Sequence, residues 1–422
     1  MLTKADDFPI HQTAEPVAYA GTDRNFYDRY FFNGYSPDGE TYFAVAFGVY
    51  PHLNIADAHF SVIRDGVQHC LHASRVLHSE RLDLSVGPIS IEVIAPLQTL
   101  KVTVKDGEGL AAEITFTGRA FPIEEPRFTR RIGPRAFMDY TRMTQNVRCE
   151  GWIEIDGARQ DLPAGTVGSR DRSWGIRPVG APDPQPPVPM TMGGFFWQWT
   201  PLNFADRSVF FHVNADPDGT AWNTRAVVLP DGATQGGGYH TEAARMAKVE
   251  LVPGTRHAQG GVLEIPVDGG LAQVTFEPVL TFLMRGIGYS GAWRHGAYKG
   301  ELVVEREDID LAAADMAAPE HVHIQALSRV TLTTPGRGAA AGPGRLRTAH
   351  RRSLSALRPA LRALPSGPAP DRVKVHHRRR RPCGGFWQGC SARPRRRRPP
   401  PPRSPRPSRP AMWNAPGPPA TA

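Results

Sequence analysis

The feature that most limits the fold of this 422-residue chain is the regular spacing of its turns. Between Tyr42 and Thr117, short runs of β-branched and apolar residues end at glycine, proline or Asp-Gly about every ten residues. Such runs indicate antiparallel strands, and a series of them favours a sandwich or a barrel. In Leu100–Val104 apolar and polar residues alternate, so one face of that strand should contact water. The expected strands of this half are Tyr42–Tyr50, Ala58–Ile63, Ile89–Ile94, Leu100–Val104, Ala112–Thr117 and Asp139–Arg148.

A proline-rich stretch divides this pattern in two. Residues 178–189 hold six prolines, which no strand or helix tolerates, so we predict an exposed linker there. The predicted fold is all-β, with one antiparallel β-domain at 1–177 and a second at 190–334. A faint similarity between Phe43–Gly66 and Val209–Gly232 is compatible with duplicated domains, although any pair of hairpins could produce it. The expected strands of the second half are Ser208–Val213, Arg225–Leu229, Lys248–Leu251, Gly261–Ile265, Ala272–Phe276, Glu301–Arg306 and Val322–Leu332.

The last segment of the chain differs sharply in composition. Residues 335–422 contain 21 Lys and Arg, one acid and 18 prolines, whereas residues 1–334 contain 29 basic and 40 acidic residues. Such a tail cannot bury a core, so we predict that it is disordered. It would serve as an arm for nucleic acid or a membrane surface, or as a proline-rich ligand, or it would be the unselected product of out-of-frame translation. The acidic body is not expected to bind nucleic acid.

Missing signals exclude several classes of protein. The four cysteines, Cys70, Cys149, Cys383 and Cys390, lack the spacing of a zinc site. Only two of them lie in the body, which suits a reducing compartment but is also compatible with one disulfide between them. No signal-peptide pattern and no apolar run as long as a membrane span is present, so we expect a cytoplasmic protein without a transmembrane segment. We also predict no cofactor, because phosphate-loop, dinucleotide, Gly-x-Ser-x-Gly and zinc-protease motifs are absent.

The stretch Gly168–Arg177, Gly-Ser-Arg-Asp-Arg-Ser-Trp-Gly-Ile-Arg, combines charges with a tryptophan inside a β-region. As a strand it would place Arg170, Arg172 and Trp174 on one face and Asp171 on the other. If the face of Asp171 lines an apolar cavity, desolvation would raise its pKa and make it a proton donor. If a bulge turns it toward an arginine, it would be an ionised partner in a salt bridge. A structural reading is also open, in which a buried Arg–Asp network ties two domains together.

Aromatic residues follow the predicted linker directly. Phe195, Phe196, Trp197 and Trp199 would either wall a pocket for a long apolar ligand or belong to the core. Large aromatic side chains serve both purposes, so the run predicts burial without choosing between them.

A glycine-rich loop at 286–296 is a second candidate region. It carries Tyr289, Trp293 and His295, and loops at the mouth of a barrel commonly carry function. Farther along, His321 and His323 would share one face of a strand and could chelate a metal. No third ligand accompanies them, so no metal site is predicted.

Several segments resemble a known protein family. They are Phe31–Gly39, Asp57–Val62, Val86–Ile89, Glu125–Phe128, Asp139–Arg142, Gly168–Gly175 and His295–Gly296. Together they make the chain similar to an uncharacterised bacterial branch of the carotenoid 1,2-hydratase (hydroxyneurosporene synthase)/AttH-like group. The resemblance implies two lipocalin-like β-domains and an apolar, polyene-like or lipidic ligand. It also implies that an acid protonates a carbon–carbon double bond before water adds, and Asp171, with Trp174 in the same motif, is the donor that the motif supports.

Two functions follow from these observations. The first is a cofactor-independent protein acting on an apolar isoprenoid or lipid-like molecule, with hydratase-type addition of water and Asp171 as the catalytic acid. The alternative is a non-catalytic carrier or chaperone of a hydrophobic ligand. The expected ligand-binding residues are Trp174, Arg177, Trp197, Trp199, Tyr289, Trp293 and His295.

Overall fold

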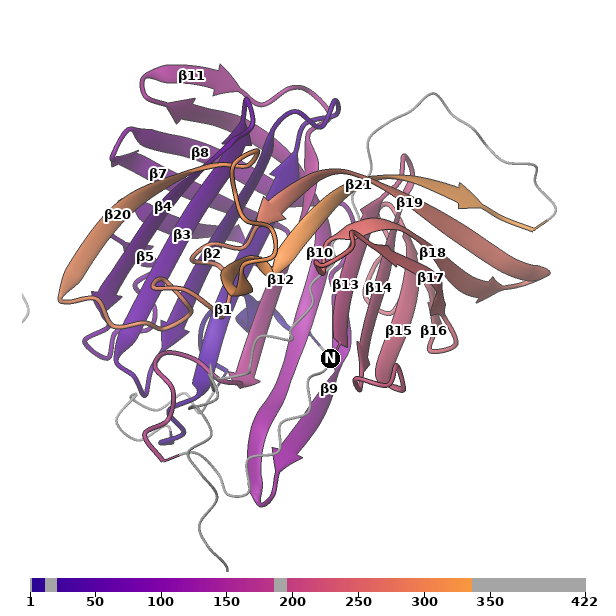
Figure 1. Ribbon diagram of the computed structural model, residues 1–422, viewed down its shortest axis with the longest axis horizontal. Helices are drawn as coiled ribbons and strands as arrows, with labels where there is room; N and C mark the ends of the chain where they lie inside the picture. Colours follow the sequence, from indigo (N-terminus) through magenta and orange to yellow (C-terminus); the bar gives the residue numbers. More distant parts are fainter. Residues whose placement is uncertain (1, 12–20, 186–195, 336–422) are drawn as a thin grey trace, which may run out of the picture. The chain divides into compact units, whose positions relative to one another are not determined.

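The computed structural model describes residues 2–11, 21–185 and 196–335, and its strands are labelled in Figure 1. Every strand pairing is antiparallel and the described residues contain no α-helix, which confirms the all-β prediction. Two short 3-10 helices are present, η1 (Lys4–Asp7) and η2 (Pro319–His321). The predicted linker lies outside the described residues from 186 onward, Phe195 lies outside them, and so does the predicted tail from 336 onward.

The largest sheet has 13 strands and forms a nearly closed barrel (Figure 1). Its order is β20-β4-β3-β2-β1-β12-β10-β8-β7-β6-β5, with β9 and β11 also paired to β10, and β5 returns to contact β3 and β4. The strands of its first half are β1 (Phe26–Tyr35), β2 (Tyr42–Tyr50), β3 (Ile55–Arg64), β4 (Val67–Val76), β5 (Ser85–Val86) and β6 (Ile89–Ala95). The others are β7 (Thr99–Gly107), β8 (Leu110–Gly118), β9 (Ile123–Ile132), β10 (Arg135–Ile155), β11 (Ala158–Asp161), β12 (Val167–Ile176) and β20 (Leu302–Asp310).

Packed side chains occupy the inside of this barrel. Tyr30, Phe32, Phe47, Phe60 and Phe116 are all buried there in one apolar cluster. The alternation predicted for Leu100–Val104 is observed, since its apolar residues are buried and its polar ones partly exposed. Burial of apolar surface on this scale is the main source of stability for such a sheet.

Two further sheets of four strands each form the rest of the described chain. One has the order β13-β14-β15-β16 and the other the order β17-β18-β19-β21. They pack on each other through residues such as Leu202, Phe211, Leu263, Val274 and Phe276. Their strands are β13 (Phe196–Asn203), β14 (Arg207–Ala215), β15 (Ala221–Pro230), β16 (Tyr239–Thr241), β17 (Arg245–Leu251), β18 (Ala258–Val267), β19 (Gly270–Leu283) and β21 (Ile324–Thr333).

The two halves of the chain are interleaved. After β19 the chain returns to the large sheet, where β20 pairs with β4, and then goes back to form β21 beside β19 (Figure 1). The boundaries 1–177 and 190–334 therefore remain predictions.

An apolar layer joins the outer face of the large sheet to the second half. In it, Phe31 of β1 packs edge-on against Trp199 of β13 with ring centroids 6.1 Å apart, beside Phe282 and Leu327.

Cys70 and Cys149 are both buried and free, so they form no disulfide.

Among the residues that the structure describes, no helix has the length and apolar character needed to cross a membrane.

Candidate functional site

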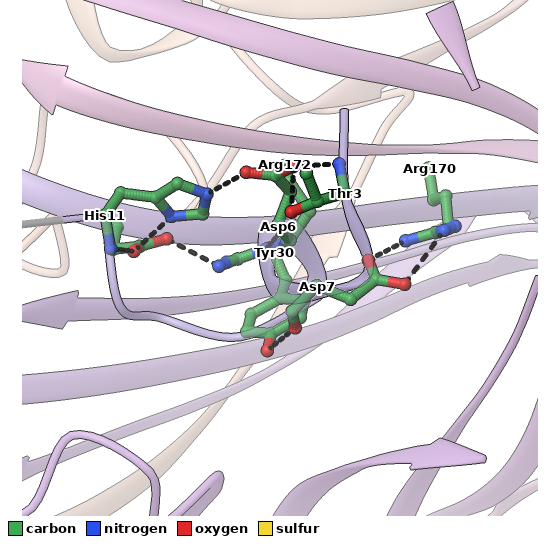
Figure 2. Close-up of polar contacts among 8 residues, drawn as sticks. Thr3, Asp6, Asp7, His11, Tyr30, Arg170 and Arg172 are labelled. Atoms are coloured by element: carbon green, nitrogen blue, oxygen red, sulfur yellow. Dashed lines mark hydrogen bonds and ion pairs between the residues drawn. The ribbon is translucent and has the colours of Figure 1, made fainter. Parts of the chain in front are cut away.

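Strand β12 lies in the middle of the large sheet, between β1 and β10, and its side chains alternate between two buried faces. On one face Arg170 donates two hydrogen bonds to Asp7, Nη1–Oδ1 of 2.6 Å and Nη2–Oδ2 of 3.2 Å. On the same face, Arg172 Nη2 donates to Asp28 Oδ1 over 2.6 Å. Arg172 Nε also donates to the carbonyl oxygen of Asp6 over 3.1 Å, so both arginines bind the N-terminal segment (Figure 2).

His11 and Trp174 extend this network. The His11 ring donates from Nδ1 to Asp28 Oδ2 over 2.7 Å and from Nε2 to Asp6 Oδ1 over 3.0 Å (Figure 2). Burial disfavours the imidazolium, but the Asp28 carboxylate and these hydrogen bonds outweigh it and raise the pKa of His11. Trp174 stacks on the His11 ring with centroids 3.6 Å apart. This face of β12 is thus a buried ion network, and Trp174 belongs to it rather than to the face of Asp171.

The opposite face of β12 brings Asp171 next to a buried arginine of β10. Arg142 Nε lies 3.7 Å from Asp171 Oδ2, and Arg142 Nη1 lies 3.6 Å from Glu125 Oε2. The guanidinium also lies over the ring of Trp197, 4.7 Å from its centroid, and 5.8 Å from that of Trp199. Burial disfavours the charged guanidinium, but the two carboxylates outweigh this and raise the pKa of Arg142. Both carboxylates therefore share one charged partner.

Glu125 is a site residue to which sequence reasoning gave no chemical role. Its Oε1 accepts hydrogen bonds from Thr144 Oγ1 (3.0 Å) and Trp199 Nε1 (3.1 Å), which fix the orientation of the carboxylate. On β9 it follows Ile123 at the two-residue spacing of one strand face, and it is buried there. A charged residue at a strand position expected to be buried was the sequence signal for this site. It lies within Glu125–Phe128, one of the segments that carry the resemblance.

Glu125 also lines a cavity of about 670 Å³ between β9 and the β15–β16 region. A ligand with an apolar body and a few polar groups would fit walls of this mixed character. The wall combines apolar residues (Leu2, Phe121, Pro122, Ile123, Leu229) with charged and polar ones (Glu124, Glu125, Arg127, Arg225, His240, Glu242).

A second cavity, of about 500 Å³, lies in the second half and is mainly apolar, with Phe196, Phe211, Val213 and Met246 among its lining residues. Asp171 lines neither of these two cavities. The larger one has three glutamates in its wall, Glu124, Glu125 and Glu242, of which only Glu125 is buried.

The predicted loop residues gather on the Asp171 side of β12. Arg177 Nη1 donates to Tyr289 Oη over 2.6 Å, and the Tyr289 and His295 rings lie 4.8 Å apart. Tyr289 packs in the same apolar cluster as Trp197 and Trp199. The structure thus brings five of the predicted binding residues into one region.

Trp293 lies beside this region, over a pair of histidines. It stacks on His72 with centroids 5.3 Å apart, and His72 Nδ1 lies 3.0 Å from His59 Nδ1. One of these nitrogens must donate and the other accept, so the hydrogen bond requires at least one neutral ring. Burial lowers the pKa of His72 to about 4, although the nearby Glu307 opposes this.

The predicted histidine pair does not lie on the last strand, because β21 begins at Ile324, after both His321 and His323. His321 ends the 3-10 helix η2 instead of lying in a strand, and its Nδ1 lies 2.7 Å from the carbonyl oxygen of Asp315. Within the described ranges, no three His, Cys, Asp or Glu side chains are grouped as metal ligands would be.

The lowered pKa of His72 predicts loss of stability in acid. The folded protein binds this proton only below about pH 4, whereas an unfolded histidine binds it near pH 6.5. The unfolded state therefore holds more protons between these values, and His72 should cost roughly 3 kcal/mol of unfolding free energy as the pH falls through this window. Urea unfolding at several pH values measures how the free energy of unfolding changes with pH. His72→Gln should make this change smaller, and an unchanged pH dependence would show that another group causes it.

Comparison with known proteins places the chain in a family. The sequence profile of a family of unknown function (DUF8625) matches residues 2–347. No functionally curated protein matches the chain.

The chain is similar to two solved structures. A candidate AttH protein of Nitrosomonas europaea is 12% identical with a TM-score of 0.44, and covers 82% of this chain and 98% of its own. Kievitone hydratase of Nectria haematococca is 10% identical with a TM-score of 0.46, and covers 82% of this chain and 94% of its own. Likeness at this level does not extend to function, so the assignment to carotenoid hydratases stays a prediction.

Proposed function

The chain belongs to this family of unknown function, DUF8625, and we propose that it is a hydratase-type enzyme that adds water to a carbon–carbon double bond. The reaction class comes from the sequence resemblance around Gly168–Gly175. The observation that carries the proposal is that Glu125, whose carboxylate is oriented by hydrogen bonds, is among the residues lining the 670 Å³ cavity. The mixed lining of that cavity fits a mainly apolar small molecule with polar substituents.

Glu125 would act as the proton carrier. Arg142 is charged and adjacent to both carboxylates, so we assign Glu125 the role of accepting a proton from water. The water oxygen then forms a bond to one alkene carbon while the π electrons move to the other carbon. That carbon takes the proton from Glu125, which regenerates the carboxylate and consumes one water. This order suits a double bond conjugated to an electron-withdrawing group.

Asp171 would act through Arg142 instead of touching the substrate. Its Oδ2 lies 3.7 Å from Arg142 Nε, and a second carboxylate there balances the guanidinium and holds it against Glu125. In this role Asp171 is a positioning residue, which replaces the acid role proposed from the motif.

The proposal is tested by incubating the purified protein with a panel of conjugated apolar alkenes in ¹⁸O-labelled water. Enzyme-dependent formation of a labelled alcohol, detected by mass spectrometry, is the expected result. Failure of every cavity-sized alkene to gain water would count against the proposal.

Filling the cavity should suppress this reaction. Thr234 lines the cavity and is exposed, so Thr234→Trp should narrow it without disturbing the fold. We expect kcat/KM to fall by about tenfold or more, which corresponds to about 1.4 kcal/mol of lost transition-state stabilisation. Thr117→Trp, an exposed change on β8 away from the cavity, is the matched control. Equal rates for the two variants would place the reaction elsewhere.

A second candidate function, carriage of a hydrophobic ligand, is favoured by the 500 Å³ cavity of the second half. Phe196, Phe211, Val213 and Met246 line it, as expected for an apolar guest. Release of an apolar molecule from the purified protein into organic solvent, without any water addition in the labelling assay, would favour this function.

A further inference from the structure

Arg177, just after β12, carries a buried charge that no described carboxylate balances. Its side chain is 1% exposed, and its guanidinium donates to one described residue, from Nη1 to Tyr289 Oη over 2.6 Å. Its Nε and Nη2 are buried and make no hydrogen bond to any described residue. Buried guanidinium donors are costly to leave unsatisfied, so they indicate a partner outside the described residues.

Aromatic rings surround this guanidinium. Its central carbon lies 3.9 Å from the ring centroid of Tyr27, 5.1 Å from that of Tyr289 and 5.9 Å from that of Tyr140. The rings offer a cation–π attraction, but their faces accept no conventional hydrogen bond from the guanidinium. The surroundings are therefore suited to a flat ligand whose polar end reaches Arg177.

A second guanidinium, that of Arg142, lies near one of these three rings, that of Tyr140. Arg142 lies 6.0 Å from the ring centroid of Tyr140, and its Nε, Nη1 and Nη2 make no hydrogen bond within the described part of the chain. Its charge is already shared with Glu125 and Asp171 at 3.6 and 3.7 Å. No carboxylate of the described residues balances the charge of Arg177 in this way. An added anion would therefore be attracted to Arg177 more strongly than to Arg142.

We propose that Arg177, together with Arg142 beside the same Tyr140 ring, binds the carboxylate of a flat aromatic or conjugated ligand. A carboxylate matches the fork of a guanidinium through two parallel hydrogen bonds. Stacking of the ligand body on Tyr27 and Tyr289 would add to this binding.

Access to the site would be through Tyr289. This residue is only partly buried, and it follows Gly286 and precedes Gly291, which have φ angles of +67° and +82°. Rotation of Tyr289 would free the Nη1 of Arg177 that it now occupies. Neither Arg177 nor Tyr289 lines the Glu125 cavity, and Arg142 is the residue that this binding site shares with the proposed hydration.

Calorimetric titration of the full chain with sodium benzoate, and with benzamide as its neutral counterpart, tests the proposal. Benzoate should bind, and benzamide should bind at least about tenfold more weakly because it lacks the charge. Arg177→Met should weaken the binding of benzoate by about tenfold or more, to the affinity of benzamide for the native chain. Tyr289→Phe keeps the ring and removes the competing hydroxyl, so it should bind benzoate at least as well as the native chain.

Controls separate binding from folding and from surface charge. Arg131→Met removes an exposed arginine and should leave benzoate binding unchanged. If Arg177→Met does not fold, Arg177→Lys keeps the charge without the fork and should bind benzoate more weakly than the native chain. Absence of benzoate binding, equal binding of benzoate and benzamide, or full binding by a folded Arg177 variant would overturn the proposal. Benzoate binding is measured without any alkene or turnover, so a failed hydration assay and a failed binding assay remain distinguishable.

Discussion

Replacing Asp7 with alanine is expected to lower the free energy of unfolding by about 3–5 kcal/mol, because it strands a buried positive charge. Arg170 is 1% exposed and donates to both oxygens of Asp7. The same carboxylate accepts the backbone N–H of Leu97, so its removal also leaves a buried donor without a partner. Urea denaturation followed by tryptophan fluorescence measures the change.

Two companion variants make this result interpretable. Asp206→Ala breaks an equally short but exposed pair with Arg207, at 2.7 Å, and should cost no more than about 1 kcal/mol. The double variant Asp7→Leu/Arg170→Met replaces the pair by apolar residues and should be less destabilised than Asp7→Ala. A loss for Asp7→Ala no larger than that of Asp206→Ala would contradict a structural role for this network.

Replacing Glu125 with glutamine should have the largest effect on catalysis. The amide oxygen can still accept the hydrogen bonds from Thr144 and Trp199, so the side chain should keep its place. It cannot accept a proton from water, and kcat for hydration should fall by about 100-fold or more. KM should change much less, because the cavity keeps its shape. A comparable rise in KM would indicate that Glu125 binds the substrate without acting on it.

The strands were predictable because they depend on local alternation. Leu100–Val104 and Tyr42–Tyr50 form strands where their patterns indicated them, as part of β7 and as β2. The pairing of β20 with β4 was not predictable, since it joins residues such as Leu71 and Arg306 that are far apart in the chain. No local pattern encodes such a contact, which forms only when the whole sheet assembles.

In the candidate site, too, the local pattern was predictable from the sequence and the long-range contacts were not. Strand alternation correctly separated Arg170 and Arg172 from Asp171, but their partners come from distant segments. Asp7 precedes Arg170 by 163 residues, and Asp28 precedes Arg172 by 144.

Glu125 illustrates why the remaining part of the site was hidden. A glutamate within a strand ordinarily marks an exposed position, so its burial beside Arg142 and Trp199 had to come from the packing of β9 against β10 and β13. Motif similarity pointed to Asp171 instead, which lies on the other side of the shared guanidinium.

The most direct test compares kcat for water addition in Glu125→Gln and Asp171→Asn, with each variant assayed at a temperature where it is folded. We predict that Glu125→Gln loses about 100-fold or more, while Asp171→Asn loses stability and less than about tenfold in kcat. A folded Asp171→Asn variant that loses hydration, beside a Glu125→Gln variant that retains it, would contradict the assignment and restore Asp171 as the acid.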